Sequence, residues 1–107
     1  IKLCGLLDLP KSLSAGPIRI DPAFHSVFVD GRKISLSPKE YDLLLFFCRN
    51  PRQAFSRDML LELVWGIDYI GSDRTVDTHI KSLRKKLNPY QTSIETIWGY
   101  GYKFDID

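Results

Sequence analysis

The segment of residues 74–87, RTVDTHIKSLRKKL, has two faces of opposite character when it is wound as an α-helix. At about 100° per residue, four apolar side chains fall within roughly 60° of arc, a narrow stripe that requires other elements to pack against it. These are Val76, Ile80, Leu83 and Leu87. The opposite face carries Arg74, Thr78, Lys81 and Lys85, with Ser82 beside them. The segment therefore predicts a helix that is anchored by one face and projects a basic, hydroxyl-bearing face rigidly.

Positive charge is concentrated around this helix. The 107-residue chain has a net charge of only +2, which by itself indicates no partner. Residues 74–103 hold six basic and two acidic side chains, a local charge of +4, whereas the remaining residues hold nine basic and eleven acidic side chains, a charge of −2. A basic end on a near-neutral body favours a polyanionic partner for that end.

Residue types that carry catalysis or bind metals are sparse and unpatterned. There is no glycine-rich phosphate loop, nucleophile elbow or His-x-x-x-His pair, so we predict no catalytic residue, no cofactor and no enzyme activity. Cys4, Cys48, His25 and His79 are too few and too scattered for a zinc site or a disulfide framework. No apolar run is long enough to span a bilayer and no signal peptide is evident, so a reducing cytoplasmic setting is expected.

The N-terminal part of the chain predicts a tail followed by short strands. Residues 1–16 are expected to be a linker or tail from a preceding domain, because Pro10 and Gly16 interrupt them, and one compact domain is expected over 17–107. In residues 18–20, apolar and polar side chains alternate as they do in a short β-strand. Residues 26–36 predict a hairpin joined at Asp30-Gly31, a pair that tolerates the positive φ of a tight turn.

Three helices follow, each with start and stop signals. Ser37-Pro38-Lys39-Glu40 is a capping box that begins a helix over 38–49, which ends at Asn50-Pro51. Its expected buried residues are Tyr41, Leu44, Leu45 and Cys48, with Leu43 and Phe47 beside them. Ser56 caps a second helix over 57–65 that Gly66 ends. After a loop over 66–73, Ser72 or Asp73 caps the third helix.

These elements together favour binding to double-stranded DNA. A helix of about 14 residues is roughly 21 Å long and fits a major groove about 12 Å wide. Arg74, Lys81 and Lys85 can reach phosphates or guanine edges, and Thr78 and Ser82 can bond phosphate or base. A C-terminal hairpin over 93–106 can act as a wing, with Thr96, Tyr102 and Lys103 as donors and Ile97 and Phe104 in the core. The loop over 66–73 is longer than in a minimal helix-turn-helix.

Four segments resemble the winged-helix output domain of OmpR/PhoB-type response regulators, in that family's order and near its spacing. They are LSPKEYDLLLFF, FSRDMLLELVWG, DRTVDTHIKSLRKKL and IETIWGYGYKF. The resemblance covers about Pro17 to Ile106. It implies an α+β winged helix-turn-helix fold with a four-stranded N-terminal antiparallel sheet, three helices and a C-terminal β-hairpin wing. The additional strand is expected around residues 21–25 or at the entry to the first helix.

Carried over residue by residue, the resemblance implies two sets of contacts. On the recognition helix they are Arg74, Thr75, His79, Lys81, Ser82 and Arg84, and on the wing they are Thr96, Trp98 and Tyr102. The loop residues Asp68, Tyr69 and Ile70 correspond to a loop that contacts RNA polymerase in some members, although Tyr69 and Ile70 could instead fold back over the helices. Trp98 stands where arginine is frequent, so packing is an alternative to minor-groove contact, and Ser82 stands where a basic residue is frequent.

Further residues have structural alternatives. His79 flanks the apolar stripe, so a buried structural role is the alternative to a phosphate contact. Arg84 lies on the same flank as Asp77, so an ion pair competes with a DNA contact. Lys86 points away from the basic face and is expected to be solvated.

We therefore predict sequence-specific binding of double-stranded DNA, by the output domain of a bacterial two-component transcriptional regulator. The resemblance implies direct-repeat sites bound by a head-to-tail dimer, a monomeric state for the isolated domain, a receiver domain elsewhere in the intact protein, and RNA polymerase as a further partner. The alternative is a winged-helix module that binds an acidic protein surface and has no preference among DNA sequences.

Overall fold

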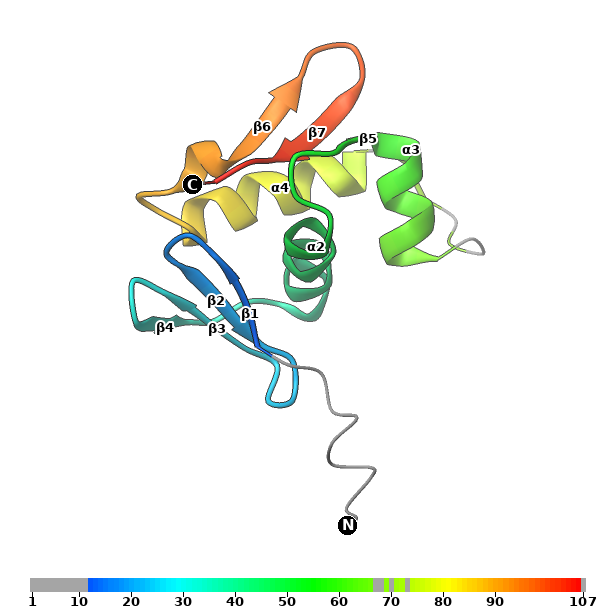
Figure 1. Cartoon of the computed structure of the whole chain (residues 1–107). Coiled ribbons are helices and arrows are strands. Elements are labelled where there is room, and N and C mark those ends of the chain that lie inside the picture. The colour runs from blue at the N-terminus through cyan, green and yellow to red at the C-terminus, as the bar shows by residue number, and fades with distance from the viewer. Residues whose placement is uncertain (1–11, 67–68, 70, 73, 107) are drawn as a thin grey trace.

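The computed structural model of this chain describes residues 12–66, 69, 71–72 and 74–106. Within these residues, two antiparallel sheets lie on opposite sides of a group of three helices (Figure 1). The N-terminal sheet has the strand order β1-β2-β3-β4, and the C-terminal sheet has the order β5-β7-β6. The predicted α+β arrangement of N-terminal sheet, three helices and C-terminal hairpin is therefore confirmed.

The N-terminal sheet consists of β1 (Leu13–Ala15), β2 (Ile18–Asp21), β3 (Ser26–Val29) and β4 (Arg32–Ile34). It begins earlier than Pro17, because β1 pairs with β2 and so belongs to the sheet rather than to a linker. The additional strand was expected around residues 21–25 or at the entry to the first helix, and both positions were wrong, because the additional strand is β1. Asp21 ends β2, and residues 22–25 form the turn to β3, in which the Phe24 N–H donates to the Asp21 carbonyl at 3.1 Å.

Helix α2 (Pro38–Arg49) begins and ends where the sequence predicted. The Ser37 hydroxyl accepts from the Glu40 N–H, and the Glu40 carboxylate accepts in return from the Ser37 N–H at 2.8 Å, which completes the capping box. Its fully buried apolar residues are Tyr41, Leu43, Leu44 and Phe47. Leu45 and Cys48, which were expected in the core, are only partly buried. Burial raises the pKa of the Cys48 thiol to about 12.

The second helix has two parts. Ser56 caps α3 (Arg57–Leu60) by accepting from the Met59 N–H at 3.1 Å, as the sequence predicted. The chain then continues as one π-helical turn over Leu61–Trp65. Gly66, with φ of 116°, ends this turn, and its N–H donates to the Glu62 carbonyl at 3.1 Å.

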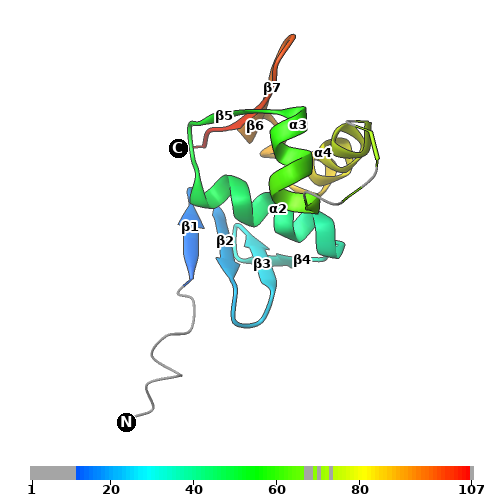
Figure 2. The same cartoon turned by 90° about the vertical axis from the view of Figure 1, so that its right-hand side faces the viewer.

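Helix α4 (Arg74–Lys86) is followed by a short 3₁₀ turn (Gln91–Ser93) and by the wing strands β6 (Ile94–Ile97) and β7 (Gly101–Phe104). A further strand, β5 (Ala54–Ser56), pairs with β7 and makes the wing part of a three-stranded sheet. The sequence did not predict β5, because a strand of three residues has almost no local signal and exists only through its pairing with β7. Figure 2 shows the wing extending away from the helices on the side opposite the N-terminal sheet.

A single core lies between the two sheets. The inner face of the N-terminal sheet contributes the buried residues Ile18, Ile20, Val27 and Val29. The helices and the second sheet contribute Leu60, Val76, Ile80, Leu83, Leu87, Ile94 and Phe104, among others. Because the stripe of α4 and the residue after it supply four of these side chains, this core fixes the position of α4 relative to both sheets.

Gly101 marks a close approach between the wing and β5. A Cβ placed on this residue would overlap the Phe55 carbonyl oxygen and lie 2.8 Å from the Ser56 Cα, and these are backbone atoms that cannot turn aside. Any side chain here would therefore force β7 away from β5.

We predict that Gly101→Ala lowers the free energy of unfolding by about 2 kcal/mol, because the added methyl group overpacks the strand pair. Gly99→Ala in the same hairpin is the control. It has a positive φ of 79° but open space around the Cβ, so it should cost only about 1 kcal/mol. Chemical denaturation measures both, and equal losses would contradict the close-approach explanation.

Candidate nucleic-acid interface

Helix α4 presents the two faces that the sequence predicted. Its apolar stripe is buried, with Val76, Ile80, Leu83 and Leu87 each at most 1% exposed. The opposite face is exposed and comprises Arg74, Thr78, Lys81 and Lys85. Among the described residues, no hydrogen bond or ion pair engages these four side chains. We call these four residues the polar face of α4.

The two flanks of α4 lie between the stripe and the polar face, and both are occupied by contacts within the protein. At about 100° per residue, Asp77 and Arg84 fall on one flank and Ser82 and Lys86 fall on the other. The first flank meets the wing and the second meets the start of α2. The contacts of each flank decide how α4 is rotated, and therefore where its polar face points.

On the wing side, Arg84 holds β6. Its guanidinium donates to the Ile94 carbonyl from Nε at 3.0 Å and from Nη2 at 2.7 Å, and Nη2 also donates to the Thr96 hydroxyl at 2.7 Å. Because β6 is an edge strand, carbonyls on its outer side have no strand partner and need another donor. The alternative of an Arg84–Asp77 ion pair was wrong, since Arg84 faces β6 instead.

Asp77 on the same flank joins three elements. One carboxylate oxygen pairs with the Arg57 guanidinium of α3 at 2.8 Å, and the other accepts from the Tyr102 hydroxyl of β7 at 2.6 Å. Burial, and then the hydrogen bond to the Asp77 carboxylate, raises the pKa of Tyr102 to about 12. At neutral pH the Tyr102 hydroxyl is thus protonated and donates to Asp77, which fastens the wing to α4.

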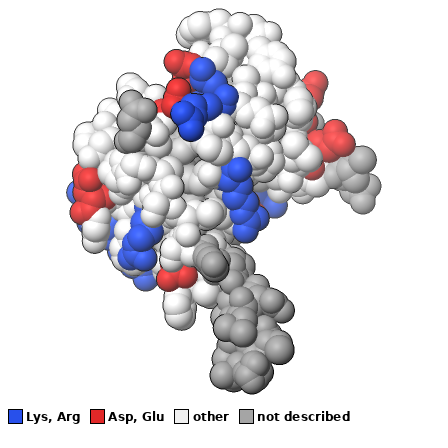
Figure 3. All heavy atoms as spheres, viewed as in Figure 1, with Lys and Arg blue, Asp and Glu red and all other residues white. Residues whose placement is uncertain are grey.

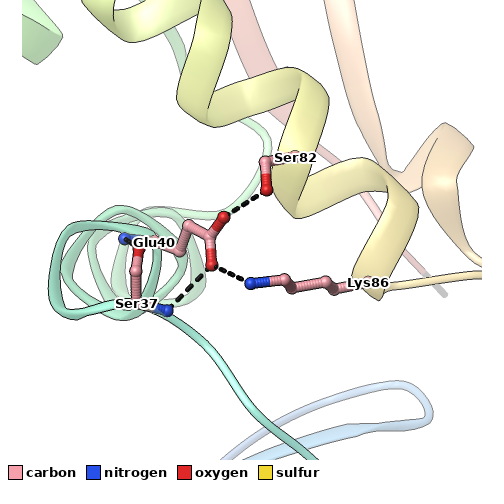
Figure 4. Close-up of polar contacts among 4 residues, drawn as sticks. All are labelled: Ser37, Glu40, Ser82 and Lys86. Atoms are coloured by element: carbon pink, nitrogen blue, oxygen red, sulfur yellow. Dashed lines mark hydrogen bonds and ion pairs between the residues drawn. The ribbon is translucent and has the colours of Figure 1, made fainter.

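On the other flank, α4 is joined to α2 through Glu40. Figure 4 shows Ser82, Lys86 and the Ser37 backbone converging on the Glu40 carboxylate. The Lys86 ammonium lies 2.6 Å from one carboxylate oxygen, and the Ser82 hydroxyl donates to the other. The prediction that Lys86 is merely solvated was therefore wrong. Its spacing of four residues from Ser82, beside the apolar stripe, was the signal that could have located this contact.

Glu40 is ionised because of these partners. Glu40 is only 4% exposed, and burial alone would raise its pKa and so oppose ionisation. Hydrogen bonds from Lys86, Ser82 and the Ser37 N–H outweigh this effect and lower the pKa of Glu40 to about 2. The carboxylate is thus a charged link between the first turn of α2 and the C-terminal half of α4.

His79 and Thr75 lie on the side of α4 that faces the second helix. The His79 Nδ1 is 2.8 Å from the Thr75 carbonyl oxygen, and the imidazole meets the Trp65 indole edge-on with 5.0 Å between ring centroids. Thr75 is partly buried, and its N–H donates to the Ser72 carbonyl at 3.0 Å. The imidazole therefore helps to pack α4 against the π-helical turn.

The wing residues differ in what they contact. The Thr96 hydroxyl accepts from Arg84, and Tyr102 is 8% exposed and bonded to Asp77. Trp98 is 91% exposed, so the packing alternative for this residue was wrong. A hollow lies between the wing and α4, lined by Asp77, Arg84 and residues 96–102. A second hollow lies beside the C-terminal half of α4, lined by Lys81, Arg84, Lys85, Asn88 and Gln91.

Of the three residues predicted to contact RNA polymerase, the structure describes only Tyr69. Asp68 and Ile70 lie outside the described residues. Tyr69 is 42% exposed, and its ring lies beside Trp65 with 6.5 Å between centroids. Tyr69 therefore combines partial packing against the second helix with an exposed edge.

The surface charge elsewhere is mixed. On the face shown in Figure 3, the basic and acidic side chains lie in small groups on a largely neutral surface, with opposite charges side by side in places. Within the described ranges, no group of three or more His, Cys, Asp or Glu residues could hold a metal ion. Nor does any described helix have the length and apolar character needed to cross a membrane.

The fold and this site define a winged-helix domain, in which a helix with an exposed polar face lies beside a β-hairpin wing. More particularly, the chain belongs to the family described as "Transcriptional regulatory protein, C terminal", whose family model matches residues 31–104. The resemblance to OmpR/PhoB-type output domains is therefore confirmed. This family consists of transcriptional regulators rather than enzymes.

Individual relatives agree with this assignment. The transcriptional regulatory protein SrrA of Staphylococcus aureus is 43% identical over 93 residues, which cover 83% of this chain and 39% of that protein. The RstA DNA-binding domain of Klebsiella pneumoniae, solved in complex with an RstA box, superposes with a TM-score of 0.78 at 36% identity, covering 90% of this chain and 98% of that one. The DNA-binding domain of Bacillus subtilis CssR gives a TM-score of 0.73 at 39% identity, covering 81% and 98%.

The Glu40 link predicts a specific pH dependence of stability. Because the pKa of Glu40 is depressed in the folded state, its contribution is present above pH 4.5 and is lost as the pH falls towards 2. We expect Glu40→Gln to lower the free energy of unfolding at pH 7 by about 2–3 kcal/mol and to flatten the decline between about pH 5 and pH 2.

Glu95→Gln is the matched control for Glu40→Gln. The Glu95 side chain is 55% exposed and pairs with Lys103 at 3.3 Å, so its neutralisation should change stability by less than about 1 kcal/mol. Urea titrations at a series of pH values measure both variants. Equal effects of the two variants at pH 7 would contradict the role assigned to Glu40.

Proposed function

We propose that this chain binds double-stranded DNA sequence-specifically, as the output domain of a two-component transcriptional regulator, with α4 in the major groove and the wing on the adjacent backbone and minor groove. The observation that carries this proposal is the division of α4 into four sides. One side is buried and two are engaged within the protein. The fourth presents three cations and a hydroxyl that have no partner among the described residues.

The polar face has the chemistry that DNA requires. Arg74 at the N-terminal end can donate two parallel hydrogen bonds to a guanine edge or reach a phosphate. Lys81 and Lys85, one turn apart, suit phosphate contacts, and Thr78, about one turn before Lys81, can bond to a base or to a phosphate. These four residues are the direct contacts that we propose.

In this proposal, most of the remaining predicted contact residues do not touch DNA but hold α4 and the wing in place. Arg84, Thr96 and Tyr102 hold the wing against α4, and Ser82 holds α4 against α2. Thr75 and His79 pack α4 on the second helix, near enough to the groove for a phosphate contact at its edge. Specificity then depends on these residues because they set the angle at which the polar face enters the groove.

The proposal extends to how the domain assembles on DNA, to the rest of the intact protein, to its location and to RNA polymerase. Pairs of these domains would occupy direct repeats head to tail, and the isolated domain would be monomeric. The chain spans 39% of the length of SrrA, which leaves length for a receiver domain in the intact protein. A cytoplasmic location suits a DNA-binding regulator. RNA polymerase would contact the loop at Tyr69, whose exposed edge supports this assignment.

Selection from a randomised duplex pool at two salt concentrations, followed by sequencing, tests the proposal. Neutralisation of four to six phosphates predicts a slope of log affinity against log salt concentration of about −4 to −5. Enrichment of a direct repeat supports the proposal. Retention without enrichment would reduce it to non-specific binding by a basic surface. Failure to bind at low salt would favour the alternative, a protein-interaction module.

Single lysine substitutions test which face of the protein binds. We predict that Lys81→Ala and Lys85→Ala each reduce the magnitude of the salt slope by about 1, because each removes one neutralised phosphate. Lys33→Ala is the control, because Lys33 is an exposed lysine on β4 of the N-terminal sheet. Fluorescence anisotropy with the selected duplex measures all three. A Lys33 effect as large as that of Lys81 would place the interface elsewhere.

A further inference from the structure

The tip of the wing carries an exposed aromatic side chain that no contact among the described residues explains. Trp98 is 91% exposed, more than any other large hydrophobic residue that the structure describes. Among the described residues its indole stacks on no other ring and takes part in no hydrogen bond. An indole left wholly in water forgoes the stabilisation that burial of its large apolar surface would give.

Hydrogen bonding and close packing fix the backbone of the turn that carries Trp98. The Tyr100 N–H donates to the Ile97 carbonyl at 2.9 Å and closes the turn, and Gly99 supplies the positive φ of 79° that this turn requires. Immediately afterwards, Gly101 is pressed against the backbone of β5. Trp98 is therefore carried on a turn that is anchored at its base.

Trp98 also lies at the edge of the proposed interface. The hollow between the wing and α4 is lined by Asp77 and Arg84 of α4 and by residues 96–102 of the wing, Trp98 included. A duplex seated on the polar face of α4 would therefore meet the wing as its next contact. The groove beside an occupied major groove is the minor groove.

The chemistry of the wing tip limits how it can contact a minor groove. Residues 94–102 contain no lysine or arginine, and Glu95 is the one charged residue among them. A cationic side chain would favour the narrow, electronegative minor groove of a stiff A-tract. An apolar side chain instead acts as a wedge that partly unstacks a base step, which is easiest at flexible pyrimidine–purine steps.

We propose that Trp98 is a specificity-determining residue that inserts its indole into the minor groove and selects a TA or CA/TG step there over an A-tract. The inference rests on the proposed function and deepens it, because it assigns the wing a readout of DNA deformability. The polar face reads base edges, and the wing tip selects a sequence that can be opened.

The test uses the duplex recovered from the randomised pool. In a set of derivatives, each dinucleotide step flanking the sequence contacted by α4 is changed in turn to TA or to AA. Affinities and salt slopes are measured for the unaltered chain and for Trp98→Phe, Trp98→Ala and Trp98→Arg. Phe24→Ala is the matched control, because Phe24 is a 77% exposed aromatic residue in the turn before β3.

The unaltered chain should prefer TA over AA at one flanking step by about fivefold or more, and Phe24→Ala should behave in the same way. Trp98→Ala should bind about tenfold more weakly, as loss of a base–aromatic stack implies. It should keep the same salt slope, because the indole neutralises no phosphate. Trp98→Phe should retain most of the affinity. Trp98→Arg should steepen the slope by about 1 and move the preference towards AA.

Indole fluorescence gives a second readout. The chain has two tryptophans, Trp65 and Trp98, so Trp65→Phe leaves Trp98 as the single reporter. Stacking against bases should quench its emission on addition of the TA duplex, and more strongly than on addition of the AA duplex.

Several outcomes would overturn the inference. They are unchanged DNA affinity in Trp98→Ala, a preference for AA in the unaltered chain, or unquenched emission in the complex. If Trp98→Ala left DNA binding intact and abolished self-association of the chain, the indole would be a protein contact instead. Failure of the proposed function itself is distinguishable, because Lys81→Ala would then also have no effect.

Discussion

Burial of one narrow stripe on α4 is the interaction on which the remaining structure depends. Val76, Ile80, Leu83 and Leu87 are essentially inaccessible to solvent, and each contributes roughly 1.5–3 kcal/mol by leaving water. Together that is comparable to the whole stability of a typical domain, about 5–15 kcal/mol. Because the stripe is narrow and bordered by polar residues, it can be buried in only one orientation, and it therefore sets the approximate rotation of the helix. The polar contacts on the two flanks complete that constraint.

Those flank contacts explain why several polar residues beside the helix are bonded within the protein. The Glu40 carboxylate receives donors from both α4 and the residue that caps α2, and the Asp77 carboxylate receives donors from both α3 and β7. Glu40 is buried, and a buried carboxylate with all its partners in place specifies one arrangement, because losing any donor leaves its charge unpaired. The capping box of α2 thereby has a second role, since the same Glu40 that caps the first turn of α2 also orients α4.

Much of the fold could be predicted from the sequence because its signals are local. The capping box at Ser37, the Asp30-Gly31 turn and the stripe of α4 each depend on residues a few positions apart, and the structure has all three where they were expected. Strands β1 and β5 could not be predicted in the same way. Each has only three residues, which is too few for a clear alternation of apolar and polar side chains; β1 pairs with the next strand, β2, whereas β5 pairs with β7, which is distant in the sequence.

The same distinction between local sequence signals and contacts made by the fold applies to the candidate site. The polar face follows from helical periodicity alone. The partners of Arg84, Ser82 and Lys86 depend on which elements the fold brings against each flank, which is why helical periodicity left Arg84 with two possible roles and placed Lys86 in solvent. Trp98 is a further case: its position in the wing was evident, but only the folded hairpin shows that nothing in the described protein covers it.

The most direct test is an amide chemical-shift map of the domain, recorded while the selected duplex is added. We predict that the largest changes fall on the polar face of α4, at Arg74, Thr78, Lys81 and Lys85, and at the wing tip. The amides of β1 to β4 should change little. If the largest changes fell instead on β1 to β4, or were spread evenly over the surface, the claim that α4 and the wing form the DNA-binding face would be contradicted.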